Sequence, residues 1–260
     1  MKIDKWATVE VKSLSVVIPV YNEALTVRTT LESIHEVMLS SQYEFELLIV
    51  ESNSTDGSRE IVEKTVFELN TISPNSTKLI LQDCAKGKGS AVREALKHAS
   101  GDAVSIYDAD DEYIPEDVIT LVDKLKEGTS SFILGSRHSK GNAMRVMDGH
   151  RILSVVMNTA HWVFTFIFNV TLRVRLTDPF TMHKVFILRM FDDVELIANR
   201  FDIDWEILGK AIRLGSIPTE ISIQYKARSY AEGKKVRIFL DPIKWIIILF
   251  RTRFTKFNRV

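Results

Sequence analysis

Short apolar segments alternate with helix-length segments through the first half of the chain, and this alternation restricts the possible folds more than any other feature. The predicted strands span residues 14–19, 46–50, 78–81, 103–107 and 131–134, and the predicted helices between them span 23–38, 57–67, 89–98 and 115–126. This order is typical of βαβ units, which form a mainly parallel sheet with helices on its faces. Functional residues of such sheets lie in loops at the carboxyl ends of the strands, so we expect a site there.

Charge balance and cysteine content exclude several classes of protein. The chain has 260 residues, enough for one sizeable α/β domain, and its 34 basic residues balance 34 acidic ones. Without a net positive field, we expect no nucleic-acid partner. The single cysteine, Cys84, excludes an intrachain disulfide and a zinc site built on cysteine pairs. The first residues contain no apolar segment of a secretory signal, so we expect a reducing, cytoplasmic location.

Residues 152–172 form an uncharged segment that is long enough to cross a bilayer. One polar stripe nevertheless recurs through it at helical spacing: Ser154, Asn158, His161, Thr165 and Asn169. This stripe favours an amphipathic helix, or a helix pair, at the membrane interface or against a partner, over a spanning helix or an internal core helix.

The end of the chain is locally basic. From Lys234 to Val260 there are eight basic residues and one acid, Asp241. Residues 241–254 are predicted to form a helix with Asp241 as its N-cap, Pro242 in its first turn and an apolar centre too short to span a bilayer. A basic amphipathic helix of this kind predicts binding to an anionic membrane surface.

The segment IYDADDEY, residues 106–113, carries the clearest chemical signal. An apolar strand ends in Asp108, Asp110 and Glu112, whose carboxylates alternate along the chain. Carboxylates spaced in this way can converge on one hard cation, and oxygen ligands suit Mg²⁺ or Mn²⁺. Such an ion would stabilise a leaving diphosphate. An acidic turn by itself is more often only solvated.

Three other loops follow predicted strands. The first, PVYNE, offers the Tyr21 ring for stacking on a base and Glu23 as an acceptor. In the second, ESNSTDG (51–57), acids and hydroxyls can bind a base and a ribose or cap the next helix. The third, AKGKGS (85–90), lacks the glycine spacing of a P-loop or a dinucleotide fingerprint, but can bring Lys88 near a nucleotide. An exposed flexible loop is the alternative for this segment.

Taken together, SVVIPVYNE, VESNSTDGS, GKGSAVREAL and the DAD cluster resemble glycosyltransferase family 2, and within it the polyprenyl- and dolichyl-phosphate sugar synthases. The resemblance extends over residues 14–254. It implies a GT-A fold, which is Rossmann-like with a mainly parallel sheet and flanking helices. It also implies a nucleoside-diphosphate-sugar donor, a divalent metal and inversion at the anomeric carbon.

The resemblance assigns the donor side of the site. Asp108 and Asp110 match the metal and donor carboxylates, and Glu112 stands where polyprenyl-phosphate transferases often have glutamine. Four residues match positions of the nucleoside pocket: Pro19, Tyr21, Glu23 and Glu51. In YKARSYAEGKK (225–235), Arg228 and Lys234 match the basic positions of a loop that closes over the donor diphosphate.

The resemblance also assigns the acceptor side. Arg137, in GSRH, and Arg151 match arginines near the acceptor phosphate, and a guanidinium suits phosphate oxygens. Asp178, in TDPFTMHKVF, matches the aspartate of a D-P-x-S-G-F segment, with Thr181 and Met182 in place of serine and glycine. FDIDWE (201–206) resembles the acidic start of the next helix.

We therefore expect a GT-A domain over residues 1–233 and a basic amphipathic element over 234–260, attached to the inner face of the cell membrane. The expected reaction is sugar transfer to a polyprenyl phosphate. Transfer to a sugar hydroxyl of a glycan is the alternative, with Asp178 as the first choice for its general base and Asp204 as the second. A sugar-nucleotide pyrophosphorylase would need a glycine-rich loop where the chain has VYNEAL. A non-catalytic membrane-docking protein would not need the acidic cluster.

Overall fold

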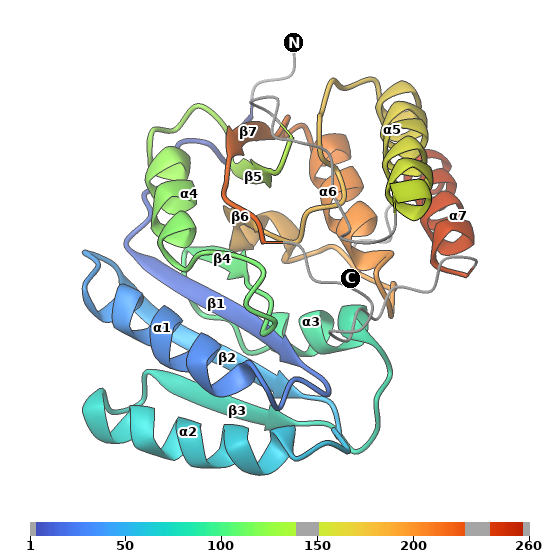
Figure 1. Cartoon of the computed structure of the whole chain (residues 1–260). Coiled ribbons are helices and arrows are strands. Elements are labelled where there is room, and N and C mark those ends of the chain that lie inside the picture. Colours follow the sequence, from blue (N-terminus) through green and yellow to red (C-terminus); the bar gives the residue numbers. More distant parts are fainter. Residues whose placement is uncertain (1–3, 139–150, 227–239, 257–260) are drawn as a thin grey trace.

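The computed structural model describes residues 4–138, 151–226 and 240–256, with residues 151–153 described as backbone only. In these residues one sheet has the strand order β3-β2-β1-β4-β6-β5-β7 (Figure 1). Its strands are β1 (Ser13–Val20), β2 (Glu44–Glu51), β3 (Thr77–Leu81), β4 (Ala103–Ile106), β5 (Phe132–Ser136), β6 (Lys184–Ile187) and β7 (Thr219–Ser222).

The sheet is mainly parallel, as predicted. β1 pairs in parallel with both β2 and β4, and Val17 lies opposite Leu48 on one side and Ile106 on the other. β3 and β7 add further parallel pairs at the two edges. β6 is antiparallel to both its neighbours, β4 and β5. The five strands predicted in the first half are all present, with ends that differ by up to two residues.

Helices cover both faces of the sheet. They are α1 (Val27–Leu39), α2 (Ser58–Ile72), α3 (Lys88–Leu96), α4 (Glu116–Lys126), α5 (Arg151–Leu172), α6 (Ile203–Leu214) and α7 (Asp241–Phe254), with a short 3₁₀ turn η1 (Leu188–Phe191) after β6. One apolar core lies between the sheet and α1, α2 and α4. A second lies on the opposite face, against α3, α5, α6 and α7.

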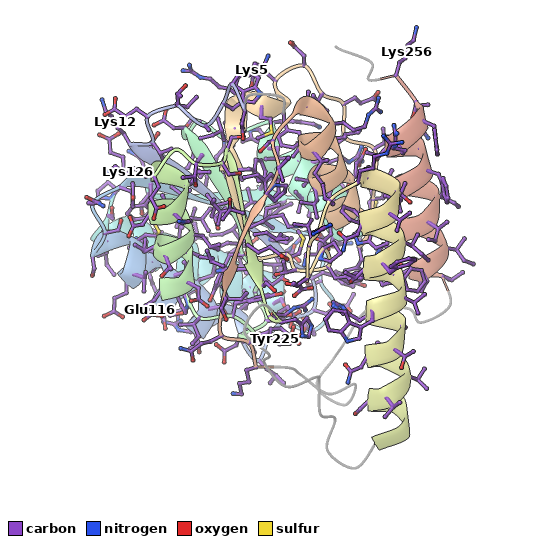
Figure 2. All side chains as sticks on the ribbon, turned by 90° about the horizontal axis from the view of Figure 1, so that it is seen from above. Lys5, Lys12, Glu116, Lys126, Tyr225 and Lys256 are labelled. Atoms are coloured by element: carbon purple, nitrogen blue, oxygen red, sulfur yellow. The ribbon has the colours of Figure 1, made fainter. Side chains whose placement is uncertain are left out.

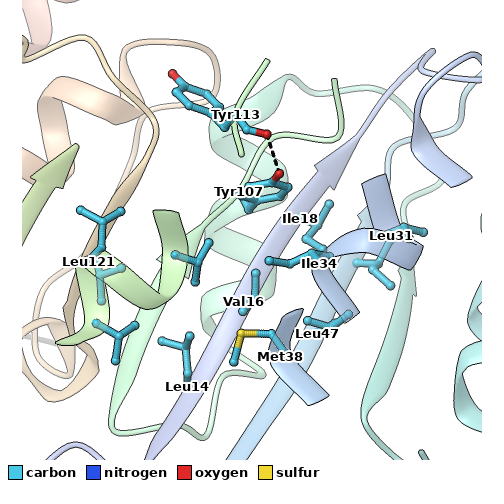
Figure 3. Close-up of a cluster of buried hydrophobic side chains, with 14 of the residues drawn as sticks. Leu14, Val16, Ile18, Leu31, Ile34, Met38, Leu47, Tyr107, Tyr113 and Leu121 are labelled. Carbon is cyan, nitrogen blue, oxygen red and sulfur yellow. Dashed lines mark hydrogen bonds between the residues drawn. The ribbon is translucent and has the colours of Figure 1, made fainter. Parts of the chain in front are cut away.

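The first core follows from the alternation of side chains along β1. Leu14, Val16 and Ile18 point to one face and are fully buried against α1 and β2 (Figure 3). At the upper end of this core, the Tyr107 hydroxyl donates a hydrogen bond to the Tyr113 carbonyl oxygen at 2.8 Å. This bond ties the acidic loop after β4 to the hydrophobic layer beneath it.

α7 belongs to the second core. The predicted helix is present at its predicted bounds, and Ile248 and Leu249 are buried against the rest of that core. The prediction that Asp241 caps this helix is wrong. The fully buried Asp241 carboxylate instead accepts hydrogen bonds from the Arg200 guanidinium, with Nε to Oδ1 at 2.9 Å, because an uncompensated buried charge would be costly.

α5 is one continuous helix whose polar stripe faces inward. Ser154, Asn158, His161 and Thr165 are buried, whereas an apolar side faces outward. The outward residues of α5 and of α7, which lies beside it, form what we call the exposed apolar face: Val155, Val163, Phe166 and Val170 with Ile243, Ile247, Phe250 and Phe254. By length and composition, Ser154–Leu172 meets the criteria for a membrane span, although such a match for a single helix is weak evidence. Figure 2 shows one end of α5 extending past the body of the domain.

The loop between β3 and α3 packs directly on another stretch of backbone. A Cβ atom added to Gly89 would lie 2.5 Å from the Ala198 carbonyl oxygen, and the Ser90 N–H donates to the Asn199 oxygen at 3.1 Å. The neighbouring Gly87 has φ +103° and faces the same carbonyl oxygen of Asn199. The glycines of AKGKGS therefore permit close packing of two backbones, and this packing fixes Lys88 between them.

We predict that Gly89→Ala lowers the free energy of unfolding by about 1–3 kcal/mol, because the added methyl group meets backbone that cannot move aside cheaply. Alanine is intrinsically favoured over glycine in a helix by about 1 kcal/mol, so a net loss would show that the clash dominates. Denaturant unfolding measures the change, with the exposed Lys97→Ala in the same region as a control expected within about 0.5 kcal/mol of wild type. An unchanged or higher stability of Gly89→Ala would contradict this account.

Candidate active site

A cavity of about 610 Å³ lies at the carboxyl ends of the strands, below α5 and α7. Loops that follow five successive strands line it, which agrees with the expected position of a site. Eight of the predicted site residues line this cavity: Pro19, Tyr21, Glu23, Lys88, Asp108, Asp110, Glu112 and Arg137. The side chain of Arg151, and all of Arg228 and Lys234, lie outside the part of the chain that the structure describes.

The acidic loop after β4 turns at Asp111, which has a left-handed φ of +58°. This turn lets the Asp110 carboxylate accept the Glu112 N–H at 3.2 Å, while the Glu112 carboxylate accepts the Tyr225 hydroxyl at 2.8 Å. Asp108 pairs with the Lys88 ammonium at 2.5 Å. Asp110 and Glu112 both line the cavity, and carboxylate oxygens are ligands that a hard divalent cation prefers, whereas Asp108 already has a cation beside it.

Hydrogen bonds join the loop after β1 to the residues after β2. The Asn22 N–H donates to the Ser54 hydroxyl at 2.9 Å, and the Glu23 N–H donates to the Ser58 hydroxyl at 2.8 Å. Asn22 and Asn53 both adopt left-handed φ values, which asparagine tolerates better than most residues. Ser54 of the ESNSTDG segment and Ser58 at the start of α2 therefore hold the PVYNE loop, with the half-exposed Tyr21 lining the cavity.

Glu51, which is predicted to belong to the nucleoside pocket, does not line the cavity. Its side chain is fully buried, and its carboxylate accepts hydrogen bonds from the Ser54 N–H at 2.6 Å and from the Arg59 guanidinium at 2.5 Å. Burial by itself would raise the pKa of Glu51, but the Ser54 and Arg59 hydrogen bonds outweigh it and hold the pKa below its usual value. Glu51 shapes the loop, and the neighbouring Ser52 is the residue that reaches the cavity.

Arg137 and Asp178 form a buried bidentate ion pair. The guanidinium Nε lies 2.6 Å from Oδ2 and Nη2 lies 2.8 Å from Oδ1. Burial would raise the pKa of Asp178, but the Arg137 charge outweighs it and keeps the pKa well below its usual value. An aspartate held in this way is a poor proton acceptor, so the geometry disfavours Asp178 as a general base. Arg137 lines the cavity and stacks over the Tyr225 ring at 4.9 Å.

A second buried ion pair lies beneath the acidic loop. Lys184, at the start of β6, is fully buried and donates to Asp204 of α6 at 2.8 Å. Burial lowers the pKa of Lys184 and raises that of Asp204, although Lys184 and Lys88 partly offset the effect on Asp204. Asp204 lines the cavity. Sequence reasoning missed Lys184, whose only signal is a charged residue at the start of the apolar strand KVFI.

The sequence analysis also assigned no role to His183. Its ring is fully buried, stacks on Tyr113 at 5.0 Å and meets Tyr107 edge-on at 5.7 Å. Burial lowers the pKa of His183 to about 3, so the ring is neutral at physiological pH. The rings of His183, Tyr107 and Tyr113 thus form an uncharged cluster that packs against the acidic loop.

The cavity changes in character toward α5 and α7. Its lining there is apolar and aromatic: Met157, Ala160, Phe164, Phe180 and Trp245. Phe180 meets the Trp245 ring at 4.9 Å and the buried Trp205 ring at 5.1 Å. One cavity thus joins a carboxylate-lined end to an aromatic end that lies beside the exposed apolar face.

Comparisons with known proteins agree with this arrangement. The family model described as "Glycosyl transferase family 2" matches residues 15–206. A dolichol-phosphate mannosyltransferase of Mycosarcoma maydis is 27% identical over 96% of this chain and 83% of its own length. One of Pyrococcus furiosus is 29% identical over 89% of this chain, which spans 64% of that relative.

Among solved structures, glucosyl-3-phosphoglycerate synthase from Mycobacterium tuberculosis, in complex with Mn²⁺, uridine diphosphate and phosphoglyceric acid, has a TM-score of 0.65 at 17% identity. The match covers 94% of this chain and 80% of that one, and it shows a shared GT-A fold. Because the family model covers well over half of the sequence, the chain belongs to glycosyltransferase family 2.

Proposed function

We propose that this glycosyltransferase moves a sugar from a nucleoside-diphosphate sugar to a polyprenyl phosphate at the cytoplasmic face of a membrane. The observation that carries the proposal is the single cavity with carboxylates at one end and aromatic residues at the other. A polyprenyl phosphate has the same division, with a charged reacting group on an apolar chain. The two dolichol-phosphate mannosyltransferases among its relatives support the same acceptor class.

The donor would lie between the loops after β1, β3 and β4. Tyr21 offers a ring to the base, Lys88 offers positive charge near the diphosphate, and Arg228 and Lys234 are proposed to close over it. Asp110 and Glu112 would hold Mg²⁺ or Mn²⁺, with Asp108 held toward the donor by Lys88. The metal would supply positive charge to the diphosphate as it leaves.

The proposed reaction is one in-line displacement with inversion at the anomeric carbon. A phosphate monoester is already ionised at neutral pH, so its oxygen needs no general base. Arg137, held rigidly by Asp178, would orient that phosphate, and Arg151 would bind it from the start of α5. Asp178 thus becomes a positioning residue for Arg137.

A hydroxyl acceptor is the second candidate, and one observation favours it. Asp204 lines the cavity, and burial raises its pKa, which suits a proton acceptor better than the depressed pKa of Asp178 does. If the acceptor is a sugar hydroxyl, Asp204 is the preferred base, which reverses the order expected from the sequence.

Membrane attachment is proposed through the exposed apolar face. Phe166 is 69% exposed on α5 and Ile247 is 60% exposed on α7, and both helices have their polar or packed sides turned inward. Two adjacent helices with outward apolar residues suit burial in the boundary between headgroups and acyl chains. The basic end of the chain adds attraction to anionic lipid.

We predict that Asp110→Asn lowers kcat at least a hundredfold, equivalent to about 3 kcal/mol of lost transition-state stabilisation, and that EDTA abolishes activity. The matched control is Asp111→Asn, which changes the exposed neighbour that does not line the cavity and keeps the left-handed turn. Release of nucleoside diphosphate measures turnover. Full activity in EDTA, or equal losses in the two variants, would refute metal binding by Asp110.

We predict that the double variant Phe166→Ser with Ile247→Ser reduces binding to anionic vesicles at low salt at least tenfold, because it removes two apolar anchors. Phe67→Ser is the matched control, since Phe67 is 75% exposed on α2, across the sheet. Deletion of residues 236–260 would be a poorer test, because Ile248 and Leu249 are buried. Equal co-sedimentation of the wild type, the double variant and Phe67→Ser would contradict attachment through this face.

We predict that Arg151→Ala raises the acceptor KM roughly thirtyfold, as expected for loss of a charge-assisted contact worth about 2 kcal/mol. Donor affinity should change less than about twofold. Arg175→Ala, an exposed arginine beyond the other end of α5, is the control. Calorimetry of donor binding and kinetics against a short-chain polyprenyl phosphate separate the two effects. Unchanged acceptor kinetics would favour the hydroxyl acceptor.

A further inference from the structure

A cluster of titratable side chains lies beside Arg137 at the boundary between the two ends of the cavity. It consists of His138, His161 and Asp178, and one ring nitrogen of each histidine and one Asp178 oxygen lie within 4.8 Å of one another. The two imidazole rings are 4.5 Å apart. Asp178 is fully buried, His161 is 9% exposed and lines the cavity, and His138 is half-buried.

The charges of this cluster suit an anion better than a metal ion. Both Asp178 oxygens accept hydrogen bonds from the Arg137 guanidinium, and the Arg137 backbone N–H adds a third at 3.1 Å. A metal ion bound to this carboxylate would share it with a fixed positive charge. An anion would instead meet a guanidinium whose charge Asp178 balances, together with two imidazoles, a residue type that can take up a proton.

The position of His161 fits the acceptor phosphate. It projects from the inner side of α5, one turn before Phe164 and one turn after Met157, which line the aromatic end of the cavity. Its Nε2 lies 3.3 Å from the Thr177 carbonyl oxygen and donates a hydrogen bond to it, which holds the ring in place. A phosphate beside His161 and Arg137 would therefore have the apolar lining next to it for its chain.

The charged groups beside the histidines include the members of the Arg137–Asp178 pair. Asp178 contributes a negative charge, and the same attraction to His161 and His138 helps to lower the pKa of Asp178. Arg137 contributes an equal positive charge, so the pair as a whole does not favour the protonated histidines, and the bound phosphate must supply the negative charge that does. Behind the pair, the Glu220 carboxylate of β7 accepts the Thr177 and Asp178 N–H groups, and burial raises its pKa. The Arg137 guanidinium also lies over the Tyr225 ring, 4.9 Å from its centroid.

We propose that His138 and His161, together with Arg137, form a subsite for the acceptor phosphate that takes up a proton when the phosphate binds. This inference rests on the proposed polyprenyl-phosphate acceptor and makes the two histidines specificity-determining residues for it. A bound phosphate dianion stabilises the protonated form of an imidazole beside it, and this stabilisation is lost where the pH is too high for the imidazole to be protonated. Acceptor affinity should therefore fall as the pH rises from 6.5 to 8.5, while donor affinity stays nearly constant.

The test is calorimetric titration of farnesyl phosphate at pH 7.5 in two buffers with different ionisation enthalpies, which reports the protons taken up on binding. We expect uptake of a fraction of a proton by the wild type. His161→Asn and His138→Asn should each bind farnesyl phosphate at least fivefold more weakly and take up less, and the double variant should take up almost none. His98→Asn, on the exposed end of the α3 region, should match the wild type. Binding of UDP and GDP should be equal in all four variants and the wild type.

The possible outcomes separate the inference from the proposed function. If the wild type binds farnesyl phosphate without proton uptake, and the histidine variants bind equally well, the subsite is wrong and the lipid-phosphate acceptor stands. If the wild type does not bind farnesyl phosphate at all, both are wrong. Tight binding of Zn²⁺ that is lost in His161→Asn and that blocks farnesyl phosphate would make the cluster a metal centre and overturn the proposal.

Discussion

Charge pairing beneath the carboxyl edge of the sheet is the constraint on which the site depends. A glycosyltransferase that handles a diphosphate needs carboxylates and cations close together, and several of these lie out of contact with water. Five carboxylates of the described residues, four of them buried and one half-buried, have a cation beside them: Glu51 with Arg59, Asp108 with Lys88, Asp178 with Arg137, Asp204 with Lys184, and Asp241 with Arg200. Removing one member of such a pair would leave an uncompensated charge, so these residues stabilise the fold and the site together.

The carboxylates differ in their partners, and these partners determine which chemical role each carboxylate can have. Asp178 is bound on both oxygens by one guanidinium and serves to hold it, whereas Asp204 has a pKa raised by burial. Asp110 accepts the Glu112 N–H, Glu112 accepts the Tyr225 hydroxyl, and both residues line the cavity, where we propose that their carboxylates bind a metal ion. Residues of one chemical type therefore have different proposed roles because their neighbours differ.

Helix α5 buries a polar stripe and exposes many apolar residues, which is the opposite of a typical helix on the surface of a soluble domain. Its buried stripe is polar, whereas many of its exposed residues are apolar, and we propose that this exposed side contacts lipid. His161 illustrates the point, since it belongs to the polar stripe and reaches the cavity beside Arg137. An enzyme that transfers sugar to a lipid-borne phosphate needs this arrangement, because its acceptor crosses the boundary between the membrane and water.

The sequence by itself determined the strands and helices of the first half, the helix at 241–254 and the loops in which the site lies, because these follow from local periodicity and from strand direction. It did not determine the antiparallel β6, the burial of Glu51 or the partners of Asp178 and Asp241. Arg137 and Asp178 are 41 residues apart in the chain, as are Arg200 and Asp241. Only the tertiary structure selects such partners, because a side chain's local sequence carries its charge but not the identity of the distant group that will neutralise it.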